Sequence, residues 1–163
     1  PETGAKEIVE AANDNGGGQV VISGHKAAVE RAIEVAKAEG VKRAMLLPVS
    51  APFHCALMAP AAEAMAEALE RAVLAAPMVP VVANVTAQPV VAPAEIRDLL
   101  VKQVTGTVRW RECVATMAAE GCDRFVEIGA GKVLTGLMKR NAPEASASAI
   151  NTPADVEAFL KSV

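Results

Sequence analysis

The sequence predicts a layered α/β or α+β fold. Short β-branched, apolar runs alternate along the chain with longer segments whose apolar residues recur every three to four positions. Hydrophobic residues make up 52% of the 163 residues, and the mean hydropathy is +0.29, so the chain can build a core and is not mainly disordered. Aromatic residues make up only 2%, so small side chains that let helices pack closely supply much of that core.

Four apolar runs are predicted to be strands. In each run apolar residues occupy both odd and even positions, which is typical of a central strand covered on both faces. The runs span residues 19–23, 43–49, 79–85 and 124–128.

The first predicted helix spans residues 25–39 and is amphipathic. One face carries the apolar residues Val29, Ala32, Ile33 and Ala36, and the opposite face is charged. Gly40 follows as a helix stop.

The remaining helices are predicted from their start and stop signals. Residues 60–75 begin with a proline and carry an apolar stripe of Met65, Leu69 and Ala72. Residues 93–104, 107–120 and 132–141 each open at a Pro, Thr or Gly signal. Residues 153–163 form the last helix, with Thr152 as N-cap and Val156, Phe159 and Leu160 as its buried face.

A boundary is expected near residues 48–52, where Pro, Ser and Pro interrupt an apolar run. Residues 1–50 would then form a small β-α-β layer distinct from residues 51–163. Such a layer is too short to stand alone, so we expect partner strands before Pro1. A proline in place of an initiator methionine favours the same interpretation, a fragment or a processed chain.

Charge, cysteine content and hydropathy exclude several protein classes. Sixteen basic and nineteen acidic residues give a net charge of −3, so no positive electrostatic field is expected that would attract a nucleic-acid partner. The cysteines Cys55, Cys113 and Cys122 form no CxxC pair, so we expect neither a disulfide framework nor a zinc site, and a reducing cytoplasm as the location. No uncharged apolar run approaches the roughly 20 residues of a membrane span, so no membrane association is expected.

Only two histidines can supply an imidazole for proton transfer near neutral pH. His25 opens a helix among polar residues and is interpreted as a solvated surface histidine. His54 lies between a predicted strand and a predicted helix, at the edge where α/β folds place functional side chains. It is either a general base or a half-buried loop histidine that holds the helix beginning at Pro60.

Other candidate groups are weaker. Consecutive side chains rarely point to one atom, which argues against a thiolate and imidazole pair of Cys55 with His54. The carboxylates of Glu63 and Glu67 lie on a solvated face. No serine lies in a GxSxG elbow, so the nucleophile for a base at His54 has to come from outside this chain.

Two glycine clusters have different contexts. Residues 16–18 precede a strand and are interpreted as a turn. Residues 129–131, Gly-Ala-Gly, follow a strand and open a helix, where backbone N–H groups could face an anion, but they lack the third glycine and the lysine of phosphate-binding motifs.

Four further segments are distinctive in their order along the chain: residues 13–26 (NDNGGGQVVISGHK), 47–58 (LPVSAPFHCALM), 101–110 (VKQV followed by VRW) and 126–137 (VEIGAGKVLTGL). Together they resemble the malonyl-CoA:acyl carrier protein transacylases of type II fatty acid synthesis. The resemblance runs from about Ala12 onward and covers nearly the whole chain.

The resemblance implies a fold and a reaction. The family has an α/β-hydrolase-like core with a smaller ferredoxin-like α+β insert, so residues 1–50 would be part of that subdomain and residues 51–163 the C-terminal part of the core. Its enzymes move a malonyl group from malonyl-CoA to the phosphopantetheine thiol of acyl carrier protein, by a ping-pong mechanism through a serine ester. No cofactor or metal is implied beyond these substrates.

The resemblance also implies roles for individual residues. His54 matches the general base, and Gln103 matches the glutamine whose backbone carbonyl orients the imidazole. Phe53 matches a bulky position that fills the space of a 2-methyl branch, and Asn15 matches an asparagine near the acyl pocket.

Several family features are missing or changed. The family's GHSxG nucleophile, its oxyanion-hole glutamine and its carboxylate-binding arginine belong upstream of these residues. We therefore expect a C-terminal half that is inactive alone, with a non-catalytic binding or scaffold module of the same fold as the alternative. Gly-Ala-Gly at 129–131 and three glycines at 16–18 replace the usual Gly-Pro-Gly and Ser-Pro-Gly.

Overall fold

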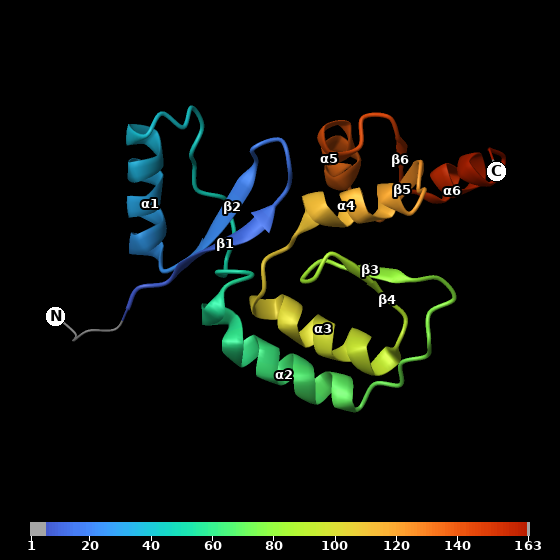
Figure 1. Cartoon of the computed structure of the whole chain (residues 1–163), viewed down its shortest axis with the longest axis horizontal. Helices are drawn as coiled ribbons and strands as arrows, with labels where there is room; N and C mark the ends of the chain where they lie inside the picture. Colours follow the sequence, from blue (N-terminus) through green and yellow to red (C-terminus); the bar gives the residue numbers. More distant parts are fainter. Residues whose placement is uncertain (1–5, 163) are drawn as a thin grey trace.

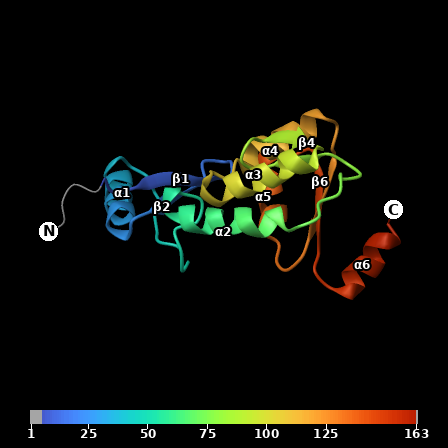
Figure 2. The ribbon, with the colours of Figure 1, turned by 90° about the horizontal axis from the view of Figure 1, so that it is seen from below.

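A computed structural model describes residues 6–162 as an elongated, mixed α/β arrangement (Figures 1 and 2). Within these residues the strands pair into three two-stranded sheets, with helices packed around them. The α/β class predicted from the alternation of strands and helices is confirmed at this level. The prediction of central strands is wrong for the described residues, because each strand has one partner, and Val20 and Ile128 are 57% and 81% exposed.

The chain begins with an antiparallel hairpin of β1 (Val9–Asp14) and β2 (Val20–Gly24). The predicted turn at Gly16, Gly17 and Gly18 is confirmed, and all three residues have positive φ (80°, 58° and 77°). Successive left-handed residues suit only glycine, which has no Cβ to clash. The sequence analysis missed β1, whose apolar positions are interrupted by charged ones.

Helix α1 (Lys26–Ala38) follows the hairpin as predicted. Ala28 is buried, and the predicted apolar face is half-buried: Val29, Ala32, Ile33 and Ala36. His25 is exposed, as predicted, and its Nδ1 accepts a hydrogen bond of 2.9 Å from the Ile8 N–H. This bond joins the beginning of β1 to the beginning of α1.

The predicted strand at residues 43–49 is wrong. In the structure this segment is an unpaired coil, and Met45 and Leu47 are 60% and 50% exposed. A strand forms only where a neighbouring strand accepts and donates its backbone hydrogen bonds, and Pro48 has no N–H to donate. The β-α-β layer predicted for residues 1–50 is therefore, over the described residues 6–50, a β-β-α unit followed by coil.

Two helices pack side by side after this coil: α2 (Ala59–Glu70), preceded by the short 3₁₀ helix η1 (Ala56–Met58), and α3 (Pro93–Thr105) (Figure 1). Helix α2 ends at Glu70, five residues before the predicted position 75. Near this end the Arg97 guanidinium donates to the carbonyls of Leu69 (2.9 Å) and Ala72 (3.0 Å). Leu69 is half-buried as predicted, whereas Met65 is 41% exposed and lies outside the packed face.

In the sequence, a second hairpin lies between these two helices and consists of β3 (Val81–Ala83) and β4 (Gln88–Val90). The strand predicted at 79–85 is shorter in the structure, because the chain reverses directly after Ala83. The sequence analysis missed the second strand, β4. Helix α4 (Trp110–Ala119) begins three residues later than predicted, since Val108 is extended and pairs with β1.

The last part of the described chain is a parallel pair of β5 (Arg124–Ile128) and β6 (Ser146–Ile150), connected by α5 (Val133–Asn141). Strand β5 and helix α5 agree with the prediction. Strand β6 was missed because its serine and alanine residues carry no apolar alternation.

Helix α6 (Pro153–Leu160) projects away from the other elements (Figure 2). The predicted N-cap is confirmed, because the Thr152 side chain accepts from the Asp155 N–H while the Asp155 carboxylate accepts from the Thr152 N–H. The predicted buried face is wrong except for the half-buried Phe159, because no described element covers Val156 and Leu160. Residue 163 at the end of the predicted helix lies outside the described residues. None of the described helices is long and apolar enough to cross a bilayer.

Candidate active site

His54 lies in the tight turn between the 43–49 coil and η1. Its φ is 59°, in the left-handed region that L-residues other than Asn, Asp and His rarely adopt. The residue is half-buried, so part of it remains accessible. The predicted strand edge is absent within the described residues, and a strained turn positions the histidine instead.

The imidazole of His54 is oriented by the end of helix α3. Its Nδ1 lies 3.0 Å from the backbone carbonyl oxygen of Gln103. Because a carbonyl only accepts hydrogen bonds, Nδ1 carries a proton, and in the neutral imidazole the lone pair is then on Nε2. The structure thus brings together two of the residues singled out from the sequence, 49 positions apart.

The carbonyl of Gln103 is well suited to this contact for two reasons. The last four carbonyls of a helix have no partner within the helix, so this oxygen is free to accept from a side chain. The C-terminus of a helix also carries partial negative charge, which stabilises a cation beside it, typically by about 0.3 to 1 kcal/mol. An imidazolium formed at His54 would be stabilised in the same way.

Cys55 is not arranged as a nucleophile. The residue is fully buried, and its Sγ donates a hydrogen bond of 3.2 Å to the Pro52 carbonyl. The next residue is held from the other side, because the Ala56 N–H donates to the Glu10 carboxylate at 3.0 Å. Both contacts fix the loop that carries His54.

Phe53 and Asn15 have less direct relations to His54. Phe53 precedes it in the turn, and the residue is 47% exposed. Asn15 lies at the far end of the β1–β2 hairpin, where its carbonyl accepts from Asn141 Nδ2 at 3.0 Å. Among the described residues no hydrogen bond connects Asn15 with His54 or Gln103.

Strand β1 of this hairpin is nevertheless hydrogen-bonded to the loop that follows Gln103. The Thr107 hydroxyl donates to the Ala11 carbonyl (2.6 Å), and the Val108 N–H donates to the Ala12 carbonyl (2.8 Å). In addition, the Arg111 guanidinium hydrogen-bonds the Asp14 carboxylate, which lowers the pKa of Asp14. These contacts hold the loop after α3 in place, and the sequence analysis did not find them.

The Gln103 side chain makes a contact of its own, which the sequence analysis also missed. Its Nε2 donates a hydrogen bond of 2.8 Å to the carbonyl of Gly106, directly after the helix. Gly106 lies in a narrow space, since a Cβ there would lie 2.8 Å from Val85 Cγ2 and 2.9 Å from the Lys102 carbonyl oxygen. No sequence motif predicts this hydrogen bond between Gln103 and Gly106.

The loop at residues 129–131 lies between a strand and a helix, as predicted, but the N-terminus of α5 already has an anion. The carboxylate of Glu127 accepts hydrogen bonds from the N–H groups of Leu134 (3.2 Å) and Thr135 (2.8 Å) and from the Thr135 hydroxyl. These bonds, above all that from the Thr135 N–H, hold the pKa of Glu127 below its ordinary value. The protein's own carboxylate therefore occupies the position that a bound phosphate would take.

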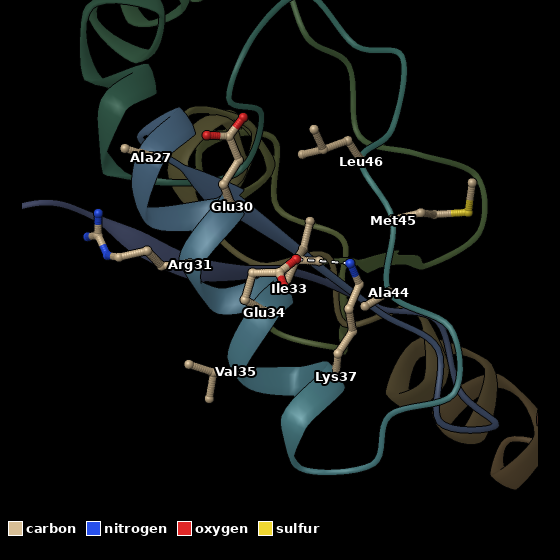
Figure 3. Close-up of a pocket in the computed structure, with 10 residues that line it drawn as sticks. All are labelled: Ala27, Glu30, Arg31, Ile33, Glu34, Val35, Lys37, Ala44, Met45 and Leu46. Carbon is tan, nitrogen blue, oxygen red and sulfur yellow. Dashed lines mark hydrogen bonds and ion pairs between the residues drawn. The ribbon is translucent and has the colours of Figure 1, made fainter.

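A wide groove of about 780 Å³ lies elsewhere, between α1 and residues 44–46 (Figure 3). Its walls are the charged side of α1, including the ion pair of Glu34 with Lys37 (2.9 Å), and the exposed side chains of Met45 and Leu46. It contains none of the candidate site residues. The groove exists because the unpaired coil leaves one side of α1 uncovered.

The backbone strain at His54 predicts an unusual order of stability. His54→Gly is expected to be more stable than His54→Ala by about 0.5 to 1 kcal/mol, because a Cβ is unfavourable at a φ of 59°. Urea unfolding of the two variants measures the difference. Ala68→Gly on the exposed side of α2 is the control, where glycine should lower stability by about 1 kcal/mol. A glycine variant less stable than the alanine variant at position 54 would contradict the prediction.

Comparison with known proteins assigns relatives to this chain. Residues 3–155 match the family model described as the acyl transferase domain. The Malonyl CoA-acyl carrier protein transacylase of Salmonella typhimurium is 49% identical over 159 residues, which are 98% of this chain and 52% of that protein.

Solved structures agree with this match. The acyl-carrier-protein-S-malonyltransferase from Bartonella henselae superposes with a TM-score of 0.90 at 53% identity, over 95% of this chain and 49% of that one. A type II PKS acyl-carrier protein in complex with its malonyl-transacylase also matches, with a TM-score of 0.90 at 45% identity, over 96% of this chain and 50% of that one. The chain thus spans about half the length of the relatives it matches.

Proposed function

Because this chain belongs to the acyl transferase domain family, with malonyl-CoA:acyl carrier protein transacylases as its relatives, we propose that it supplies the general base of such a transacylase. The observation that carries the proposal is the bond between His54 Nδ1 and the Gln103 carbonyl. In the neutral imidazole this bond places the proton on Nδ1, and Nε2 is then the nitrogen that can accept a proton.

In the proposed reaction His54 acts twice. First, Nε2 takes the proton of a serine hydroxyl, the serine oxygen attacks the malonyl thioester carbonyl, and the tetrahedral intermediate expels the thiolate of coenzyme A, which takes the proton from the imidazolium. Next, Nε2 takes the proton of the carrier protein's phosphopantetheine thiol. The resulting thiolate attacks the serine ester, and the proton returns to the serine oxygen.

A neutral carbonyl in place of a carboxylate changes the electrostatics of this pair. In triads with aspartate, the negative charge stabilises the imidazolium that forms. Here the Gln103 carbonyl and the C-terminal end of α3 provide partial negative charge only. The base is therefore oriented firmly but polarised less strongly.

The finer assignments of the fold belong to the same proposal. Residues 51–163 would form the C-terminal part of an α/β-hydrolase-like core, and residues 1–50 part of a ferredoxin-like subdomain. The match over about half of each relative's length supports a chain that is one part of a two-part unit. The unpaired coil at residues 43–49 supports the same division, because its apolar side chains lack cover within the described residues.

Malonyl-CoA and an acyl carrier protein are the proposed partners, in fatty acid biosynthesis. The related malonyl-transacylase solved together with an acyl-carrier protein supports the second of these. The cytoplasm is the proposed location, which the three free cysteines support.

The test uses a complete enzyme, in which this chain takes the place of the matching segment of the S. typhimurium transacylase. Expected are a malonyl-enzyme after incubation with malonyl-CoA and transfer of that group to carrier protein. If the folded complete enzyme forms the ester no faster than its His54→Ala variant, this result would contradict a base at His54.

Phe53 is proposed to determine acyl selectivity, and Phe53→Ser in the complete enzyme tests this. If the ring fills the space of a 2-methyl branch, its removal should admit methylmalonyl-CoA. One methyl group in such a pocket is worth about 1 to 3 kcal/mol, so the ratio of kcat/KM for the two thioesters should change by about 10- to 200-fold. Parallel loss of both activities and of thermal stability, with an unchanged ratio, would mean that Phe53 only packs against α2.

A further inference from the structure

We propose that the side chain of Gln103 is a positioning group for the base, in addition to the backbone carbonyl of the same residue. Its amide Nε2 holds the last turn of α3 against Gly106, and this contact keeps the Gln103 carbonyl aimed at His54 Nδ1. The inference rests on the proposed function, because positioning matters only if His54 acts as a base.

The end of α3 explains why the carbonyl needs a second support. In a continuing helix the Gln103 oxygen would accept from the N–H four residues later. The helix ends instead at Thr105, Gly106 is extended (φ −92°, ψ 150°), and the Gly106 N–H donates to the Lys102 carbonyl. The Gln103 carbonyl is therefore available to His54, but it lies in the final turn, where helices fray.

The side-chain bond attaches this turn to a rigid support. Gly106 lies between Val85 and the Lys102 carbonyl, with no room for a Cβ. The next two residues are bound to β1 through the Thr107 hydroxyl and the backbone of Val108. The 2.8 Å bond from Nε2 therefore connects the helix end with a loop that is itself held in place.

The amide oxygen of Gln103 argues against a role of this side chain in packing alone. Gln103 Oε1 is buried and has no hydrogen-bond partner among the described residues. A buried acceptor without a partner is destabilising, so leucine or methionine would fill the same space at lower cost. A glutamine at this position is better explained by the donor that it presents to Gly106.

The test is Gln103→Leu in the complete enzyme, with two readouts. Imidazole ¹⁵N NMR, with the His54 signals assigned from a His54→Gln variant, should show mainly the Nδ1–H tautomer in the parent and a mixture of tautomers in the variant. The kcat should fall by about 10- to 100-fold, less than the about 10²- to 10⁴-fold expected for loss of the base, with KM for malonyl-CoA unchanged. Gln88→Leu, on the exposed residue of β4, is the matched control and should change neither readout.

A second variant moves the acceptor instead of the donor. Gly106→Ala should produce the same tautomer mixture, because the new Cβ displaces the carbonyl from its narrow space. If both variants act through one bond, the double variant loses no more activity than the stronger single variant. If Gln103→Leu fails to fold, Gln103→Glu keeps the length and Oε1 but presents no donor as a carboxylate, and it should show the same mixture.

The outcomes separate the two proposals. An unchanged tautomer and kcat in Gln103→Leu, or additive losses in the double variant, overturn the positioning role while His54→Ala still removes activity. Full activity in His54→Ala overturns the proposed base, whatever the tautomer at His54.

Discussion

Replacing His54 by alanine should lower kcat of the complete enzyme by about 10²- to 10⁴-fold, because general base catalysis contributes that much to acyl transfer. Among the described residues the imidazole of His54 is oriented for this role, because its Nδ1 is bound to the Gln103 carbonyl, 3.0 Å away. Initial rates of malonyl transfer to carrier protein, at saturating malonyl-CoA, measure the loss.

The fold should survive this substitution. His54 is half-buried in a turn, and its ring is hydrogen-bonded to the Gln103 carbonyl, so little packing is lost. His25→Ala is the control, because His25 is exposed and its ring is hydrogen-bonded to the Ile8 N–H, away from His54, and kcat should remain nearly unchanged. Equal losses in the two variants, or an unfolded His54→Ala protein, would make His54 a structural residue.

The second large effect concerns the 163 residues by themselves: the isolated chain should transfer no malonyl group. None of its serines lies in a GxSxG elbow, and without a serine ester no acyl-enzyme can form. Radiolabelled malonyl-CoA with gel-purified chain, and the same assay with the complete enzyme, measure the difference.

Stability should follow the same pattern. The coil at residues 43–49 and the outer side of α6 expose apolar side chains, so the isolated chain should unfold at lower urea concentration than the complete enzyme. Transfer by the isolated chain at a rate near that of the complete enzyme would refute the assignment of the nucleophile to another part. Carrier-protein binding by a complete enzyme that never forms the ester would favour the binding or scaffold module instead.

The sequence by itself determined those features that depend on neighbouring residues. The glycines at 16–18 define a turn because only glycine takes three successive left-handed conformations. Thr152 and Asp155 define the start of α6 because the capping box is a local exchange of hydrogen bonds. His54 and Gln103 were identified through contiguous motifs and their resemblance to a family, and each motif is read along the chain.

Tertiary structure alone decided which segments pair and which residues meet. Residues 43–49 have the composition of a strand and remain coil, whereas residues 146–150 lack that composition and pair with β5. Backbone hydrogen bonds in a sheet come from segments distant in sequence, so no local pattern specifies them. The bond from Gln103 to Gly106 spans only three residues, yet it depends on where α3 ends and on how β1 holds the following loop, and both are properties of the folded chain.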